Sequence, residues 1–206
     1  MGKIRHVIEA LISVFLFVFQ RIPLSSTSDV LHTVSAMLTP LAVYLFSLRW
    51  ASPDFLGQID FILFSEKIMF GRIVAITGFI VFLAACATLL RVRRKEKIVT
   101  TRLYSVVRHP QYFGIIVVTL GITIMSLQSG FGGADNVVLI WLIQVLGYVM
   151  LAAYEERHLM NEYKEEYQQY KQKVSFIFPV PAVTEIPEPL LSLALALVIA
   201  FLLTFL

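Results

Sequence analysis

Residues 70–90 read FGRIVAITGFIVFLAACATLL, and this stretch decides the fold class. A helix of about 20 consecutive apolar residues is long enough to cross the roughly 30 Å hydrocarbon core of a bilayer. The rest of the chain has the same character, because 58% of its 206 residues are hydrophobic and only 15% are charged. A soluble domain is typically about 45 to 50% apolar. The sequence therefore predicts an all-α, polytopic integral membrane protein.

Other apolar runs predict a bundle of about five to six transmembrane helices, at roughly 20 residues each, in one membrane domain. The additional spans are expected at residues 4–19, 30–48, 113–127, 137–154 and 190–206. The first is interpreted as a retained helix, because no cleavage site of small residues follows it. Residues 49–67 contain an apolar run too short to cross, which indicates an interfacial loop.

A charged stretch at 155–173 predicts an amphipathic helix outside the hydrocarbon. One face of that helix would carry residues that recur every four positions, namely Glu155, Leu159, Tyr163 and Tyr167. Prolines are then expected to interrupt regular structure at positions 179, 181, 187 and 189.

The basic residues predict the orientation of the bundle. A formal charge of +3 would be compatible with nucleic-acid binding, but the basic side chains adjoin apolar runs instead of forming a soluble basic face, so no nucleic-acid partner is expected. Cytoplasmic loops of membrane proteins carry an excess of lysine and arginine. Segment 91–97, the motif at 108–114 and Glu155 are expected on the same side of the membrane, and most basic residues fall on that side. We therefore expect that side to face the cytoplasm. The N-terminus would then lie outside, an orientation that Lys3 and Arg5 oppose.

A polar motif, Arg108-His109-Pro110-Gln111-Tyr112-Phe113-Gly114, precedes the hairpin of spans that ends at Glu155. The proline disfavours helix at its preceding residue, so the backbone there should be extended, with polar groups available to a ligand, and a helix should start near the phenylalanine. Tyr104 and Tyr112 offer aromatic faces for a base or a cation. Glu155 can accept hydrogen bonds from ribose hydroxyls or pair with an ammonium group. Together these groups indicate a site for a nucleoside that carries positive charge.

Each of these residues also has a simpler interpretation. Arg108 and His109 could reach lipid headgroups, and the two tyrosines could belong to the aromatic belt at the membrane interface. The pair Glu155-Glu156 could begin a solvated helix. The single cysteine, Cys86, is interpreted as a filler of the apolar core.

Residues 99–114, VTTRLYSVVRHPQYFG, together with EERHL at 155–159 and EEYQQY at 165–170, resemble the isoprenylcysteine carboxyl methyltransferases and their phospholipid methyltransferase relatives. The resemblance covers roughly residues 96–179. It implies S-adenosylmethionine as cofactor, no metal, and cofactor binding by Glu96, Lys97, Ile98, Val99, Tyr104, His109, Pro110, Gln111, Tyr112 and Glu155.

The same resemblance divides the chain into N-terminal spans at 1–90, a methyltransferase-like catalytic core at 91–179 and a C-terminal apolar segment at 180–206. It implies catalytic roles for three residues, namely Arg108, His109 and Glu155. Methyl transfer would proceed by in-line displacement to a lipophilic acceptor that enters from the bilayer, either a prenylcysteine carboxylate or a lipid head group, with membrane lipids as the surroundings.

One departure from the family bears on the acceptor. Leu151 stands where the prenylcysteine enzymes carry an arginine thought to hold the substrate carboxylate, and leucine cannot donate hydrogen bonds. Two other classes of function stay open. A membrane reductase of isoprenoids or sterols has a similar Arg-His-Pro-x-Tyr stretch, and its NADPH could use the basic residues of segment 91–95. A non-enzymatic membrane scaffold would use the same cluster as an interface anchor.

Overall fold

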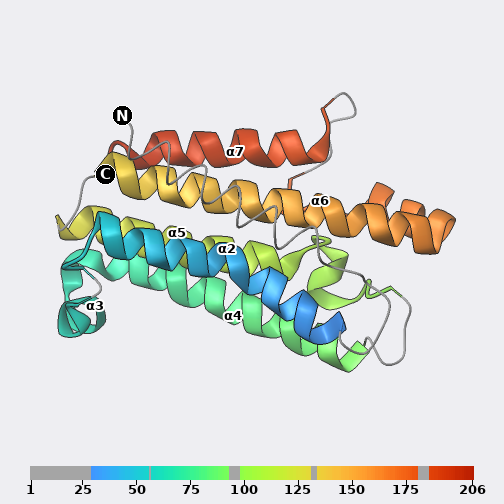
Figure 1. Cartoon of the computed structure of the whole chain (residues 1–206), viewed down its shortest axis with the longest axis horizontal. Helices are drawn as coiled ribbons and strands as arrows, with labels where there is room; N and C mark the ends of the chain where they lie inside the picture. The colour runs from blue at the N-terminus through green and yellow to red at the C-terminus, as the bar shows by residue number, and fades with distance from the viewer. Residues whose placement is uncertain (1–28, 56, 93–97, 131–133, 181–185) are drawn as a thin grey trace.

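The computed structural model describes residues 29–55, 57–92, 98–130, 134–180 and 186–206. Within these ranges the chain forms helices and no β-strand, so the all-α prediction is confirmed. The helices are α2 (Asp29–Ala51), α3 (Ile59–Phe64), α4 (Met69–Val92), α5 (Pro110–Ser129), α6 (Ala134–Lys173) and α7 (Glu188–Leu203), with the 3-10 helices η1 (Glu66–Ile68) and η2 (Arg102–Ser105). Figure 1 shows the long helices aligned along one axis as a bundle.

Three segments in the described part of the chain are long and apolar enough to cross a membrane, which identifies an integral membrane protein. They are Glu66–Val92, Pro110–Ser129 and Asn136–Lys173, and they contain the spans expected at 70–90, 113–127 and 137–154. The second and last expected spans correspond to α2 and α7, which contribute shorter apolar stretches. The expected span at 4–19 lies outside the described residues, and the total number of crossings stays a prediction.

Helices α4 and α5 form a hairpin whose backbones approach closely. Gly71 and Gly78 on α4 face Gly114 and Gly121 on α5, and a Cβ atom on any of these four residues would come within 3.0 Å of the backbone of the opposite helix. Small residues permit such close packing between helices in membranes. The hairpin therefore holds the start of α5, and with it the polar motif, beside the C-terminal part of α4.

Buried hydroxyl groups connect α2 to this hairpin and to α6. Tyr44 on α2 donates to the carbonyl of Thr119 at 3.0 Å and lies 2.8 Å from the hydroxyl of Thr123. Tyr148 on α6 donates to the carbonyl of Met37 at 2.9 Å. Each of these tyrosines buries its ring and satisfies its polar tip, which specifies how the helices are rotated against one another.

Helix α6 differs from the prediction of a separate amphipathic helix at 155–173. It continues from Ala134 to Lys173 and contains one non-helical residue, Lys164, with φ 34° and ψ −106°. Its C-terminal part extends beyond the ends of the other helices (Figure 1). The kink separates Tyr163 from Tyr167, so the expected four-residue repeat does not remain on one continuous face.

The starts of α5 and α7 also differ from expectation. Helix α5 begins at Pro110 instead of near Phe113, because proline suits the first position of a helix, where the missing N–H has no partner to lose. Helix α7 begins at Glu188 and accommodates Pro189 in its first turn for the same reason. The expected interfacial loop at 49–67 contains the short helix α3 at the end of the bundle opposite to the motif (Figure 1).

Candidate functional site

The motif is attached to the segment that follows α6. Val107 forms an isolated parallel bridge with Ser175, and the amide of Arg108 donates to the carbonyl of Ser175 at 2.8 Å. The backbone of His109 is non-helical, with φ −124° and ψ 61°, as expected for a residue before proline. Its amide donates to the carbonyl of Phe176 at 3.2 Å, and its carbonyl accepts from the amide of the first turn of α5. The expectation that these backbone groups are available to a ligand is therefore wrong.

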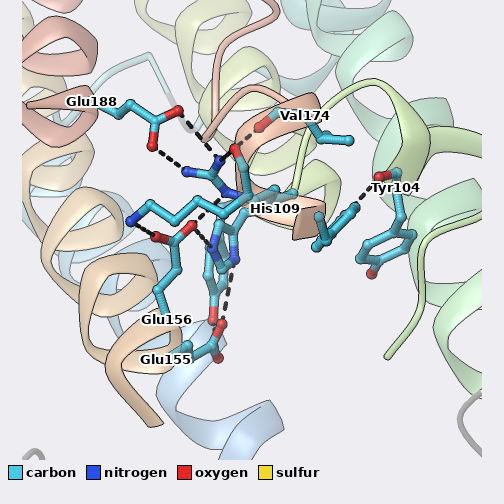
Figure 2. Close-up of polar contacts among 10 residues, drawn as sticks. Tyr104, His109, Glu155, Glu156, Val174 and Glu188 are labelled. Atoms are coloured by element: carbon cyan, nitrogen blue, oxygen red, sulfur yellow. Dashed lines mark hydrogen bonds and ion pairs between the residues drawn. The ribbon is translucent and has the colours of Figure 1, made fainter. Parts of the chain in front are cut away.

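Arg108 is the centre of a buried ion cluster, shown in Figure 2. Its Nε donates to Glu156 Oε1 at 2.6 Å, and its Nη2 donates to Glu188 Oε2 at 2.5 Å. Its Nη1 donates to the carbonyls of Lys171 and Val174 at 2.8 and 2.6 Å. Burial lowers the pKa of Arg108, but the hydrogen bonds and charges of the two carboxylates raise it above its ordinary value. The guanidinium thus connects the motif, α6 and α7.

Glu156 is a residue that sequence reasoning treated only as a neighbour of Glu155. Its Oε1 accepts from Arg108, and its Oε2 accepts from Lys171 Nζ at 2.9 Å. Its side chain is 7% exposed, compared with 25% for Glu155. Adjacent helical residues point about 100° apart, so one of two neighbouring glutamates can be buried while the other is accessible. The burial of Glu156 could not be predicted, because it depends on the position of Arg108 relative to α6, which the linear sequence does not contain.

Glu155 lies at the accessible edge of the cluster. The hydroxyl of Tyr112 donates to Glu155 Oε1 at 2.5 Å, and His109 Nδ1 lies 3.4 Å from Glu155 Oε2. The two neighbouring carboxylates therefore differ in their contacts: Glu156 is bound by cations, whereas Glu155 is held by a phenol and an imidazole and retains contact with solvent. The convergence of the motif and Glu155 at one end of the bundle is confirmed.

His109 lies between the two carboxylates with its side chain 4% exposed. Its ring stacks on Tyr112, with centroids 5.5 Å apart and an angle of 13°, and meets Phe176 edge-on at 5.4 Å. Its Nε2 is 3.5 Å from Glu156 Oε1 and makes no hydrogen bond. Burial lowers the pKa of His109, but the two nearby carboxylates raise it above its ordinary value. A buried nitrogen without a well-formed hydrogen bond is uncommon and calls for an explanation.

Three further predicted cofactor residues, Tyr104, Gln111 and Ile98, contact one another or the C-terminal part of α6. The hydroxyl of Tyr104 donates to Gln111 Oε1 at 3.1 Å, and the carbonyl of Tyr104 accepts from Tyr170 at 2.6 Å. Burial raises the pKa of Tyr104 above its ordinary value. Ile98 packs in a small buried cluster with Tyr167 and Tyr170.

Five more positions named in the sequence analysis complete the comparison. Val99 is half-buried and Pro110 is buried at the start of α5. Glu96 and Lys97 lie outside the described residues. Leu151, four residues before Glu155 on α6, is buried with 2% of its surface exposed.

Comparisons with known proteins agree with the resemblance seen in the motifs. A family model described as "Protein of unknown function (DUF1295)" matches residues 30–174. Protein-S-isoprenylcysteine O-methyltransferase B from Arabidopsis thaliana is 28% identical over 109 residues, which are 52% of this chain and 53% of that protein. The chain thus spans about half the length of the curated relative it matches. No solved structure gives a significant match. The predicted similarity to isoprenylcysteine methyltransferases is confirmed.

Proposed function

The chain belongs to the DUF1295 family of proteins of unknown function, and we propose that it is an S-adenosylmethionine-dependent membrane methyltransferase that acts on a lipophilic acceptor. The observation that carries the proposal is the buried imidazole of His109, held between Glu155 and Glu156, with Nε2 at 3.5 Å from Glu156 Oε1 and without a well-formed hydrogen bond. The similarity to a plant methyltransferase supports the class of reaction.

The charges around His109 suit a cationic ligand. Two cationic side chains and three carboxylates meet there, namely Arg108, Lys171, Glu155, Glu156 and Glu188. With a neutral imidazole these side chains carry one excess negative charge, and a protonated imidazole balances it when no ligand is bound, since both glutamates raise the pKa of His109. A ligand with a positive sulfonium would balance the same charge beside a neutral imidazole. S-adenosylmethionine therefore fits the electrostatics of these residues.

Glu155 is the residue best placed to bind the cofactor directly. Its carboxylate is more accessible than that of Glu156, and the hydroxyl of Tyr112 orients one of its oxygens by a hydrogen bond. We assign it to accept hydrogen bonds from ribose hydroxyls or from an ammonium group. We propose that the rings of Tyr112 and Phe176, which flank His109, also contact the nucleoside or its cation. The proposed cofactor set is completed by Glu96, Lys97, Ile98, Val99, Tyr104, His109, Pro110 and Gln111.

Bound S-adenosylmethionine would supply an electrophilic methyl group. The protein's own contribution would be placement of the reactants in a site with little water, which supplies up to roughly 7 to 11 kcal/mol in well-oriented reactions. His109 would bind through Nε2 and could accept the proton of an amine or thiol acceptor. Arg108 has donors engaged by Glu156, Glu188 and two carbonyls. We therefore propose it as a positioning residue, and its expected contact with a cofactor carboxylate stays a prediction.

The acceptor is proposed to enter from the bilayer, while the cofactor enters from the cytoplasm. Basic residues lie in the elements that meet at the motif end of the bundle, which favours a cytoplasmic location; they are Arg91 at the end of α4, Arg102 in η2, and Arg157, Lys164 and Lys173 in the C-terminal half of α6. Leu151 supplies an apolar wall one helical turn before Glu155 and gives no donor for a substrate carboxylate. An acceptor thiol, amine or phospholipid head group would not need that donor.

Calorimetry on the purified protein tests the proposal. We expect binding of S-adenosylmethionine and of its demethylated product, and no binding of NADPH. Transfer of radiolabelled methyl groups into lipid extracts and prenylcysteine analogues would then identify the acceptor. Binding of NADPH alone would refute the proposal in favour of a membrane reductase, and binding of none of these ligands would leave the scaffold interpretation.

A further inference from the structure

A hollow lies beside the ion cluster, between α7 and the segment that follows α6. Its volume is about 250 Å³. One side is formed by Phe176, Phe178 and Val180, and the other side is formed by residues of α7 between Glu188 and Val198. A cavity of about 150 Å³ lined by apolar side chains holds one benzene molecule, so this one has room for roughly ten carbon atoms.

The wall on α7 changes from polar to apolar along the helix. Glu188 stands at the start of α7, followed by Leu191, Leu195 and Val198. These spacings of three and four residues place the side chains on one face, over about 15 Å of helix. Val198 is 55% exposed, so the apolar end of the hollow reaches the outer surface of the bundle. Such an arrangement matches an amphiphile with a polar head at Glu188 and a hydrocarbon chain along α7.

The hollow and the proposed cofactor site share a wall. Phe176 lines the hollow, and the same ring lies edge-on to His109 with centroids 5.4 Å apart. Glu188 also lines the hollow and pairs with Arg108. In Figure 2 Glu188 on α7 and His109 of the motif lie at the same cluster of polar contacts. A head group at the polar end would therefore lie beside the cluster that surrounds His109.

We propose that this hollow binds the hydrocarbon chain of the methyl acceptor, with the Arg108–Glu188 pair at its polar end. The identification of the ligand as the methyl acceptor rests on the proposed function. The shape and polarity of the hollow indicate a single-chain amphiphile by themselves. Helix α7 lies beyond residues 30–174, the part that the family model matches. The length of chain accepted would then depend on how far the hollow extends along α7.

Photo-crosslinking tests the proposal without requiring turnover. The full-length protein in lipid nanodiscs would be labelled with a farnesylcysteine analogue or a lysophosphatidylethanolamine, each with a diazirine in its hydrocarbon chain. The two probes distinguish a prenyl chain from an acyl chain. We expect one of them to label α7 between Leu191 and Val198, as mapped by mass spectrometry of the peptides.

The variant Ala194→Trp should fill the hollow, since Ala194 lines it, while Leu197→Trp adds a larger apolar side chain at a 59% exposed position of the same helix that does not line it. Ala194→Trp should weaken labelling about tenfold. The indole would exclude part of the ligand's hydrocarbon chain, and the burial of two methylenes contributes roughly a factor of ten to an affinity. Leu197→Trp should leave it unchanged. Equal labelling in both variants, or labelling spread over all lipid-facing helices, would show contact with bulk lipid only and overturn the proposal.

Calorimetry with S-adenosylmethionine on the same samples separates the two proposals. Labelling of α7 without cofactor binding would retain the chain-binding hollow and reject the methyltransferase. Cofactor binding without selective labelling of α7 would retain the methyltransferase and reject the hollow as the acceptor site. Both variants should unfold at the same temperature as the unaltered protein if the substitutions act only locally.

Discussion

Arg108 Nη2 donates to Glu188 Oε2 at 2.5 Å, which joins the polar motif to a helix 80 residues further along the chain. The arginine side chain is fully buried and the glutamate side chain is 16% exposed. Because the same guanidinium also binds Glu156, the position of α7 is coupled to that of α6 and to His109 between them. The C-terminal helix is therefore a structural part of the candidate site.

Replacing Glu188 by Gln should loosen α7. The amide can still accept one hydrogen bond from Arg108 but no longer carries the charge, and loss of a partner in a buried ion pair is destabilising. We expect a lower unfolding temperature and faster amide hydrogen exchange in α7. Glu165→Gln, at an exposed position of α6, is the matched control. Identical exchange in both variants would show that the ion pair does not hold the helix.

The two neighbouring glutamates should respond differently to the same substitution. Glu155→Gln should weaken binding of S-adenosylmethionine about tenfold or more, since a hydrogen bond to a charged group contributes roughly 1.5 to 3 kcal/mol. Its effect on the unfolding temperature should be small because its side chain is 25% exposed.

Glu156→Gln should mainly destabilise the protein, because it leaves Arg108 and Lys171 with one carboxylate charge fewer. Removing a partner from a buried pair costs up to about 3 to 5 kcal/mol. Calorimetry and thermal unfolding of both variants measure the difference. Equal loss of affinity with equal stability would contradict separate roles for the two side chains.

The stability of the protein should depend on the protonation of His109. Its pKa is raised above its ordinary value by Glu155 and Glu156 despite burial. A raised pKa in the folded state means that the charged imidazole stabilises the fold fully below the unfolded pKa of about 6.5. This contribution is lost as the pH rises through the folded pKa.

Thermal unfolding of the unaltered protein between weakly acidic and weakly alkaline pH should therefore show a fall in stability with rising pH that His109→Gln reduces. His158→Gln is the control, since the His158 side chain is 42% exposed and contacts only the exposed Glu162 among the ion pairs described for it. Parallel pH profiles for all three proteins would exclude His109 as the titrating group.

The close hairpin of α4 and α5 should be sensitive to a single methyl group. In Gly78→Ala the new Cβ would come within 3.0 Å of the backbone of α5 at Val118 and Gly114. Overpacking of this kind costs typically about 1 to 3 kcal/mol. Gly57→Ala should have little effect, because its Cβ would meet only the carbonyl of Asp54 at an ordinary 3.5 Å. The unfolding temperatures of the two variants test this prediction, and equal values would contradict it.

The class of the protein and the region of its site followed from the sequence alone. Apolar length is a local property, so residues 70–90 predict a membrane helix without knowledge of their neighbours. The proline of the motif likewise constrains the backbone of His109 locally. The end of the bundle that holds the motif and Glu155 followed from counting the crossings between them.

The tertiary structure alone decided which side chains meet. Whether Glu155 or Glu156 is buried depends on how α6 is rotated against α5, and this rotation is determined by packing of residues far apart in the chain, such as Trp141 on α6, whose Nε1 donates to the carbonyl of Ile116 on α5. The partners of Arg108 come from three separate segments for the same reason. Periodicity shows that a helix has a polar face, but only the packed bundle determines what that face contacts.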